Sequence, residues 1–235
     1  MSNETSRALN QLAKEIERIH LATFGKGDRI VGLTAPYPAS GVSLVASLLA
    51  ERCKLSGTPT LLCDLSMADD ARFDSSKWSP GDGSAGQAAR VDPLGYDRLT
   101  PRPGKEDKFR FSDAKKLRSM FDNDLVRYHA IIVDLAAQGA EAQAAIDATV
   151  AATACDAIML VCQVGSVTRP MLAAATAALN EAGAPLRGVI ANEVNAPTLG
   201  QEIAREARKM EKYAPYLARW IARKAEQSEI LSIPA

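Results

Sequence analysis

The residues with the clearest chemical pattern lie in a short loop, Pro38–Ser43, that follows an apolar strand predicted over residues 29–34. A loop between a strand and the start of a helix directs backbone N–H groups toward one point and favours an anion. The phosphate-binding version of this loop reads G-x-x-x-x-G-K-[ST]. Gly41 and Ser43 match its last glycine and its hydroxyl residue, whereas Val42 occupies the lysine position. The sequence therefore predicts the frame of a phosphate site without its main positive charge.

Polar residues also end three of the predicted strands. Asp64 ends the second strand, Asp134 ends a later one, and Asn192 follows the last. Because the carboxyl ends of parallel strands share one edge of a sheet, where such sheets bind ligands, we expect these side chains near the loop. Ser43, Asp64 and Asp134 are therefore candidate ligands for Mg²⁺. The competing interpretation treats the two aspartates as helix-capping carboxylates, Ser43 as a helix N-cap and Asn192 as a turn residue.

Strands and helices alternate along the chain and would position these residues. Short apolar runs predict strands, and longer amphipathic stretches predict helices. The strands are predicted over residues 29–34, 60–63, 130–134, 157–164 and 186–191, and the helices over residues 44–55, 113–126 (with Ser112 as N-cap), 141–154 and 170–182. Parallel strands need such crossover helices. The predicted fold is α/β, a single doubly wound, mostly parallel sheet with helices on both faces.

The sequence divides into a helical lead-in over residues 1–28 and one α/β domain over residues 29–235. The lead-in has apolar residues at three- and four-residue spacing, which is typical of a helix packed on its own core, with a helix that faces a partner as the alternative. Residues 66–107 are rich in Asp, Ser, Gly and Pro, so most of this segment is predicted as a flexible loop, with a short strand near residues 96–99. The tail, residues 199–224, is predicted to be helical and charged.

Composition excludes several classes of function. The 28 basic and 28 acidic residues give a formal net charge of zero, so no broad basic surface for nucleic acid is expected. The 4 cysteines are far apart in sequence and show no metal-ligand spacing, which favours small buried apolar residues. No signal peptide opens the chain and no apolar run reaches about 18 residues. We therefore expect a cytoplasmic protein that reaches a membrane only through a partner.

Five features in a fixed order resemble the MinD/ParA-like P-loop ATPases. They are the loop, Asp64, and the segments Tyr128–Asp134, Cys155–Val161 and Gly188–Val194. The helical lead-in, the approach to the loop and the long segment before the second aspartate resemble more closely the tyrosine autokinases of bacterial capsule and exopolysaccharide export. The resemblance covers roughly residues 8–200.

The resemblance implies a P-loop NTPase fold that binds ATP or ADP with Mg²⁺. By the family's pattern, the nucleotide-binding residues are Ser40, Gly41, Val42, Ser43 and the base-contacting Asn192, and the Mg²⁺ ligands are Ser43, Asp64 and Asp134. A motif similar to the family's oligomerising E-x-x-R-x-x-R begins at Glu15, with Leu21 in place of its last arginine, which implies a homo-oligomer.

The sequence differs from the family at the positions whose residues bind phosphate or take part in phosphoryl transfer. Tyr37 and Val42 stand where the family has its two loop lysines, and the early loop glycine is replaced around Pro38–Ala39. Ser66 replaces a second aspartate, and Leu135–Ala137 replaces the family's Thr-Pro-Pro. The C-terminal tyrosine cluster that the autokinases phosphorylate is reduced to two tyrosines, Tyr213 and Tyr216.

Removing one preorganised charge from such a site costs about 10²–10³-fold in rate, and several are missing here. The favoured hypothesis is a pseudokinase-like protein of exopolysaccharide, capsule or adhesin polysaccharide synthesis and export. It would bind a membrane polysaccharide co-polymerase or an export protein, with weak affinity for ATP or ADP and Mg²⁺. The alternative is an atypical ATPase or tyrosine autokinase in which Lys26, or a lysine of a partner chain, replaces the missing one. A polar-localisation ATPase of the MinD/ParA kind ranks last, because the dimer-linking lysine is absent.

Overall fold

A computed structural model describes residues 3–66, 78–101, 108–138 and 146–193, with the isolated positions 203–204, 207–208, 219 and 223–224. Four expectations lie wholly or partly outside these residues. They are the tail helix, its two tyrosines, the first part of the helix predicted over residues 141–154, and residues 67–77 and 102–107 of the predicted loop. No helix in the described part of the chain combines the length and apolar character needed to span a membrane.

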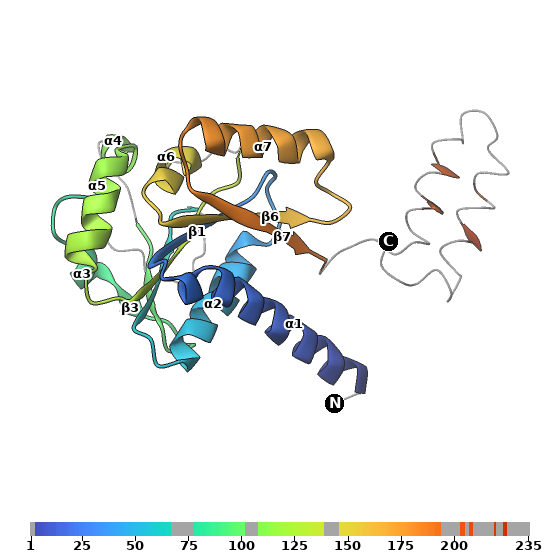
Figure 1. The fold of residues 1–235 in the computed structure, drawn as a ribbon, viewed down its shortest axis with the longest axis horizontal. Helices are drawn as coiled ribbons and strands as arrows, with labels where there is room; N and C mark the ends of the chain where they lie inside the picture. Colours follow the sequence, from blue (N-terminus) through green and yellow to red (C-terminus); the bar gives the residue numbers. More distant parts are fainter. Residues whose placement is uncertain are drawn as a thin grey trace.

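Seven strands form one sheet in the order β3-β4-β2-β5-β1-β6-β7 (Figure 1). Their bounds are β1 Ile30–Thr34, β2 Thr60–Asp64, β3 Arg90–Val91, β4 Asp97–Leu99, β5 Ala130–Asp134, β6 Ala157–Gln163 and β7 Leu186–Asn192. All neighbouring strands run parallel except β3, which pairs antiparallel with β4. Every residue of β1, β2 and β5 is buried, because helices cover both faces of the sheet centre. The predicted doubly wound α/β fold is confirmed.

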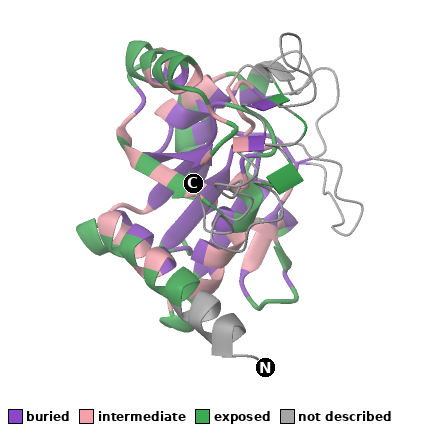
Figure 2. Cartoon of the chain, turned by 90° about the vertical axis from the view of Figure 1, so that its right-hand side faces the viewer, coloured by how far each residue is buried: buried purple, intermediate pink, exposed green. Residues whose placement is uncertain are grey.

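Helices lie on both faces of the sheet and pack into two hydrophobic clusters. Their bounds are α1 Asn3–Ala22, η1 Phe24–Lys26, α2 Val42–Leu55, α3 Ala85–Ala88, α4 Lys108–Phe111, α5 Ala114–Ser119, the π-helix η2 Met120–Asp124, α6 Ala148–Thr153 and α7 Arg169–Glu181. Apolar residues of α1 and α2 pack on one face, and those of α3, α5, η2, α6 and α7 pack on the other. Figure 2 shows the buried residues concentrated along the sheet and on the sides of the helices that face it.

The segment predicted as a flexible loop over residues 66–107 is ordered where the structure describes it, and that expectation is wrong for residues 78–101. These residues form α3, β3 and β4, and they add two strands to the sheet. Trp78, Tyr96 and Leu99 are buried, and the Trp78 ring packs edge-on against Phe111 with 5.1 Å between centroids. A few large apolar residues, widely spaced among polar ones, hold this segment on the core. The short strand predicted near residues 96–99 is β4.

The helix predicted over residues 113–126 has a different start and a different end. Asp113, not Ser112, is the N-cap, because its carboxylate accepts hydrogen bonds from the backbone N–H groups of Lys115 and Lys116 at 3.0 and 3.3 Å. The α-helix stops at Ser119 and continues as the π-helix η2. A π-turn shifts the hydrogen-bond pattern by one residue, which the apolar spacing of the sequence does not reveal.

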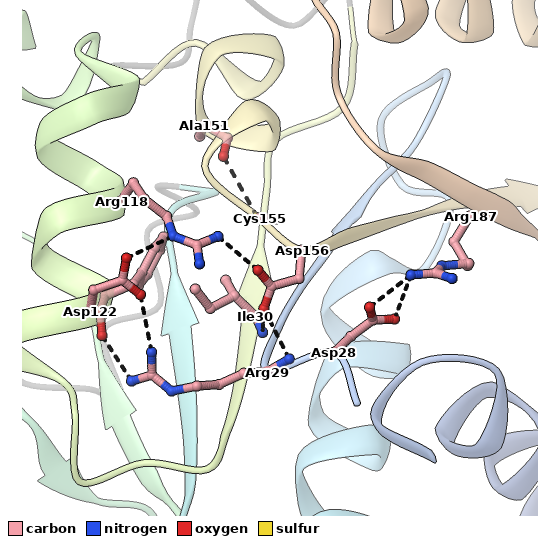
Figure 3. Close-up of polar contacts among 10 residues, drawn as sticks. Asp28, Arg29, Ile30, Arg118, Asp122, Ala151, Cys155, Asp156 and Arg187 are labelled. Carbon is pink, nitrogen blue, oxygen red and sulfur yellow. Dashed lines mark hydrogen bonds and ion pairs between the residues drawn. The ribbon is translucent and has the colours of Figure 1, made fainter. Parts of the chain in front are cut away.

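A network of charged residues fastens the amino ends of the central strands, at the edge opposite the loop (Figure 3). The Asp156 carboxylate, just before β6, accepts hydrogen bonds from the backbone N–H groups of Arg29 and Ile30 at 2.9 and 2.8 Å. It also accepts one from the Arg118 guanidinium of α5 at 2.7 Å, and Arg118 pairs in turn with Asp122. One side chain therefore connects the starts of β1 and β6 with α5.

Candidate functional site

The loop between β1 and α2 contains two residues with left-handed backbone conformation and leads directly into the helix N-terminus. Ala39 and Gly41 both have positive φ angles, +61° and +89°. Gly41 is the N-cap of α2 and makes no side-chain capping bond, so the interpretation of Ser43 as N-cap is wrong. Ser43 lies in the first turn of α2, close enough to the Asp134 carboxyl to lower the pKa of that carboxyl. The helix therefore begins with backbone N–H groups that no side chain of its own cap residue covers.

Asn192, at the end of β7, holds this loop. Its side-chain amide donates a hydrogen bond to the backbone carbonyl of Ser40 at 2.8 Å. The Ser40 hydroxyl in turn donates to the Tyr37 carbonyl at 2.7 Å. A Cβ atom added at Gly41 would overlap the Asn192 amide nitrogen, so the glycine is required for this close approach. The structure thus brings Asn192 to the loop, as expected for the carboxyl edge of the sheet, and gives it a contact that fixes the loop backbone.

Asp64 and Asp134 lie opposite each other on the neighbouring strands β2 and β5. Asp134 is 1% exposed, and one oxygen of its carboxylate, Oδ1, has no hydrogen-bond partner among the described residues. Burial, and secondarily the charge of Asp64, raise the pKa of Asp134 to about 7, while the nearby Ser43 side chain and the charge of Arg98 oppose this shift. The Asp64 carboxylate accepts hydrogen bonds from the backbone N–H and hydroxyl of Ser66 at 3.2 and 2.8 Å.

Arg98, on β4, is the residue of this site that the sequence reasoning missed. Its Nη1 atom lies 3.5 Å from Asp64 Oδ2, and its Nε donates a hydrogen bond to Asp92 Oδ2 at 3.0 Å. The side chains of Arg98, Asp64 and Asp92 are only 12%, 9% and 3% exposed. The sequence does contain one signal for Arg98: it is a charged residue that lies between Tyr96 and Leu99, within a short predicted strand.

The arrangement around Asp64 does not fit a divalent cation. A guanidinium already pairs with one carboxylate oxygen, and Ser66 donates to the other. Within the described residues, no three His, Cys, Asp or Glu side chains converge as a metal-ligand set. Ser43 and Asp134 remain together, but Asp134 is a carboxyl with a pKa raised to about 7, whereas hard divalent cations prefer ionised carboxylates.

The phosphate side of the site has no basic residue in the loop. Tyr37 and Val42 occupy the positions of the two lysines expected by resemblance. Lys26, suggested as a replacement, ends η1 and precedes β1, whereas the loop follows β1. The five-residue strand between them spans about 16 Å. Lys26 therefore lies at the wrong edge of the sheet, and that expectation is corrected.

No protein-family model matches the sequence, and no curated protein is significantly similar to it. Solved structures do share the fold. The kinase domain of the Escherichia coli tyrosine kinase ETK matches with a TM-score of 0.63 and 21% identity, over 77% of this chain and 74% of that chain. The VpsO kinase domain matches with a TM-score of 0.60 and 23% identity, over 81% and 99%.

MinD of Pyrococcus horikoshii, solved as a complex with Mg-ADP, matches with a TM-score of 0.54 and 19% identity, over 86% of this chain and 96% of that chain. The chain therefore has the P-loop NTPase fold shared by bacterial tyrosine kinase domains and MinD, as its sequence predicts. At these identities the likeness establishes the fold, and activity has to be argued from the site.

The contact between Gly41 and Asn192 makes a testable prediction. Gly41→Ala should destabilise the protein by about 2–4 kcal/mol, because alanine adds the cost of a positive φ and an overlap with the Asn192 amide. Gly57→Ala is the matched control: Gly57 has a φ of +77°, and an added Cβ would meet nothing within 4 Å. It should cost only about 1–2 kcal/mol. Urea denaturation measures both, and equal losses would contradict the contact.

Proposed function

We propose that this protein is a pseudokinase-like member of the bacterial tyrosine kinase fold group, one that acts by binding rather than by phosphoryl transfer. The observation that supports this most is the charge distribution of the site. The loop that would hold phosphate contains no basic residue, and Arg98, a buried cation at the same edge of the sheet, is paired with two carboxylates.

Phosphoryl transfer depends almost entirely on positioning and on the neutralisation of developing negative charge. Loss of one such charge costs about 10²–10³-fold in rate, and here the two lysine positions hold Tyr37 and Val42. A nucleotide bound at Ser40–Ser43 would depend on backbone N–H groups alone, which supports weak affinity for ATP or ADP.

The cellular role in this proposal follows from the autokinases that the sequence resembles. The protein would be a cytoplasmic component of exopolysaccharide, capsule or adhesin polysaccharide synthesis and export. It would bind a membrane polysaccharide co-polymerase or an export protein, and it would meet the membrane only through that partner. A homo-oligomer built through the region that begins at Glu15 belongs to the same proposal.

The competing candidate, an atypical ATPase or autokinase, requires a cation delivered to the loop. Lys26 lies at the opposite edge of the sheet, so that cation would have to come from a partner chain. Labelling with γ-phosphate-labelled ATP and Mg²⁺ separates the two proposals. We expect no label on the full chain, alone or with the cytoplasmic part of its co-polymerase, and we expect that part to bind without nucleotide. Label transfer that disappears in Asp134→Ala would overturn the pseudokinase proposal.

A further inference from the structure

We propose that Arg98 is a built-in counter-ion that takes the place of a divalent cation at the carboxyl edge of the sheet. One protein that shares this fold, MinD, was solved as a complex with Mg-ADP. In this chain the positive charge is covalently part of β4. The inference goes beyond the proposed function, because it concerns the acidic residues whether or not a nucleotide binds.

The position of Arg98 follows from strand register. Arg98 pairs with Leu62 on the adjacent parallel strand β2, and Asp64 lies two residues further along that strand. Side chains two residues apart in a strand point to the same face. Arg98 and Asp64 therefore share one face of the sheet, and Asp134, in register with Asp64, lies on that face as well. The long arginine side chain reaches along this face to Asp64.

The contacts of Arg98 are those of a buried ion, not of a surface residue. Its Nη1 faces Asp64 at 3.5 Å and its Nε bonds Asp92 at 3.0 Å, while Nη2 lies 3.5 Å from the Tyr96 hydroxyl. Asp92 is fixed independently, because its Oδ1 accepts the backbone N–H of Leu94 at 2.9 Å. Two nearly buried carboxylates thus face one guanidinium from two sides.

The chemistry of arginine makes this neutralisation permanent. A guanidinium stays protonated at every pH at which proteins fold, and its planar donors suit carboxylates. A divalent cation, in contrast, binds according to its concentration and to the ionisation of its ligands. With Arg98 in place, Asp64 and Asp92 gain little from a metal. Without it, these two buried carboxylates would have no positively charged partner, and a divalent ion would become their best counter-ion.

The test compares the full chain with Arg98→Met and with the control Arg90→Met. Arg90 is the register partner of Arg98 on β3, and its exposed guanidinium bonds the backbone carbonyls of Gln87 and Ala89. In chelator-treated buffer, Arg98→Met should lower the melting temperature by about 6–12 °C. Millimolar Mn²⁺ should restore at least about half of that loss and bind in a calorimetric or electron spin resonance titration. The wild type and Arg90→Met should show neither effect.

Two results would overturn the inference. One is wild-type protein that binds Mn²⁺ and loses that binding in Asp64→Asn. The other is Arg98→Met protein that is destabilised but neither binds nor is stabilised by Mn²⁺, since that behaviour indicates a structural ion pair only. If Arg98→Met does not fold in chelator, refolding it in millimolar Mn²⁺ decides: recovery of folded protein with bound Mn²⁺ supports the inference, and no recovery overturns it. Failure of these metal titrations is distinguishable from failure of the proposed function, which the phosphate-labelling experiment tests.

Discussion

Asp134→Asn is expected to stabilise the protein by about 2–4 kcal/mol at pH 8. Burial, with the charge of Asp64, raises the pKa of Asp134 to about 7, far above the value of about 3.9 for an exposed aspartate. At pH 8 the folded protein must therefore hold an ionised carboxylate that the unfolded chain ionises at no cost. An asparagine keeps the size of the side chain and a hydrogen-bonding group for Ser43, but it carries no charge.

The sign of the pH dependence is part of this prediction. Below about pH 4 the carboxyl is protonated in both states, so the advantage of asparagine should vanish there. The advantage should grow as the pH rises from about 4 to about 7 and stay constant above that. Urea denaturation at pH 4.5 and pH 8 measures it. Glu181→Gln, at an exposed position of α7, should change stability by less than about 0.5 kcal/mol at both values. A loss of stability in Asp134→Asn at pH 8 would contradict this electrostatic description of the site.

Asp156→Ala is expected to destabilise the protein by about 2–4 kcal/mol at neutral pH. The substitution removes the acceptor of two backbone N–H groups at the start of β1 and the partner of Arg118 (Figure 3). Burial alone would raise the pKa of Asp156, but the hydrogen bonds from Arg118, Ile30 and Arg29 outweigh it and lower the pKa overall. The contribution of Asp156 is therefore complete above about pH 4 and is lost as the pH falls through the lowered pKa.

Asp122→Ala is the matched control for this substitution, because Asp122 shares Arg118 but bonds the side chains of Arg118 and Arg29 rather than the backbone of β1. The side chains of Asp122 and Arg118 are 43% and 44% exposed, so the loss of the ion pair between them should cost less than about 1 kcal/mol. Chemical denaturation at pH 7 and pH 3 compares the variants. The deficit of Asp156→Ala should shrink at the lower pH. Equal deficits for the two variants, or a deficit unchanged at pH 3, would show that the strand-end bonds contribute little.

The parts of the fold that the sequence predicted are those with regular apolar patterns. β1, β2, β5 and β6 are short buried runs, and α2 and α7 are amphipathic stretches bounded by turn residues, so each appears within a few residues of its predicted bounds. The segment over residues 78–101 was missed because its order depends on single large residues, such as Trp78 and Leu99, that pack on distant elements. Local composition does not report such contacts.

In the candidate site, too, some residues could be placed from the sequence and others could not. Asp64, Asp134 and Asn192 end parallel strands, so their convergence near the loop follows from topology and could be predicted. Arg98 could not, because its role depends on β4 pairing with β2 in one register. Nucleotide binding at Ser40–Ser43 remains a prediction from the sequence. The Mg²⁺ site predicted at Asp64 does not fit the side chains that surround it, because Arg98 and Ser66 already pair with that carboxylate.

The most direct test of the central claim is a calorimetric titration of this 235-residue chain with ATP in the presence of Mg²⁺. A phosphate loop without its basic residues should bind ATP with a dissociation constant of about 1 mM or weaker, and with no release of phosphate over hours. A dissociation constant in the micromolar range, accompanied by turnover, would show that a cation reaches the loop and would contradict the proposal that this protein is a pseudokinase.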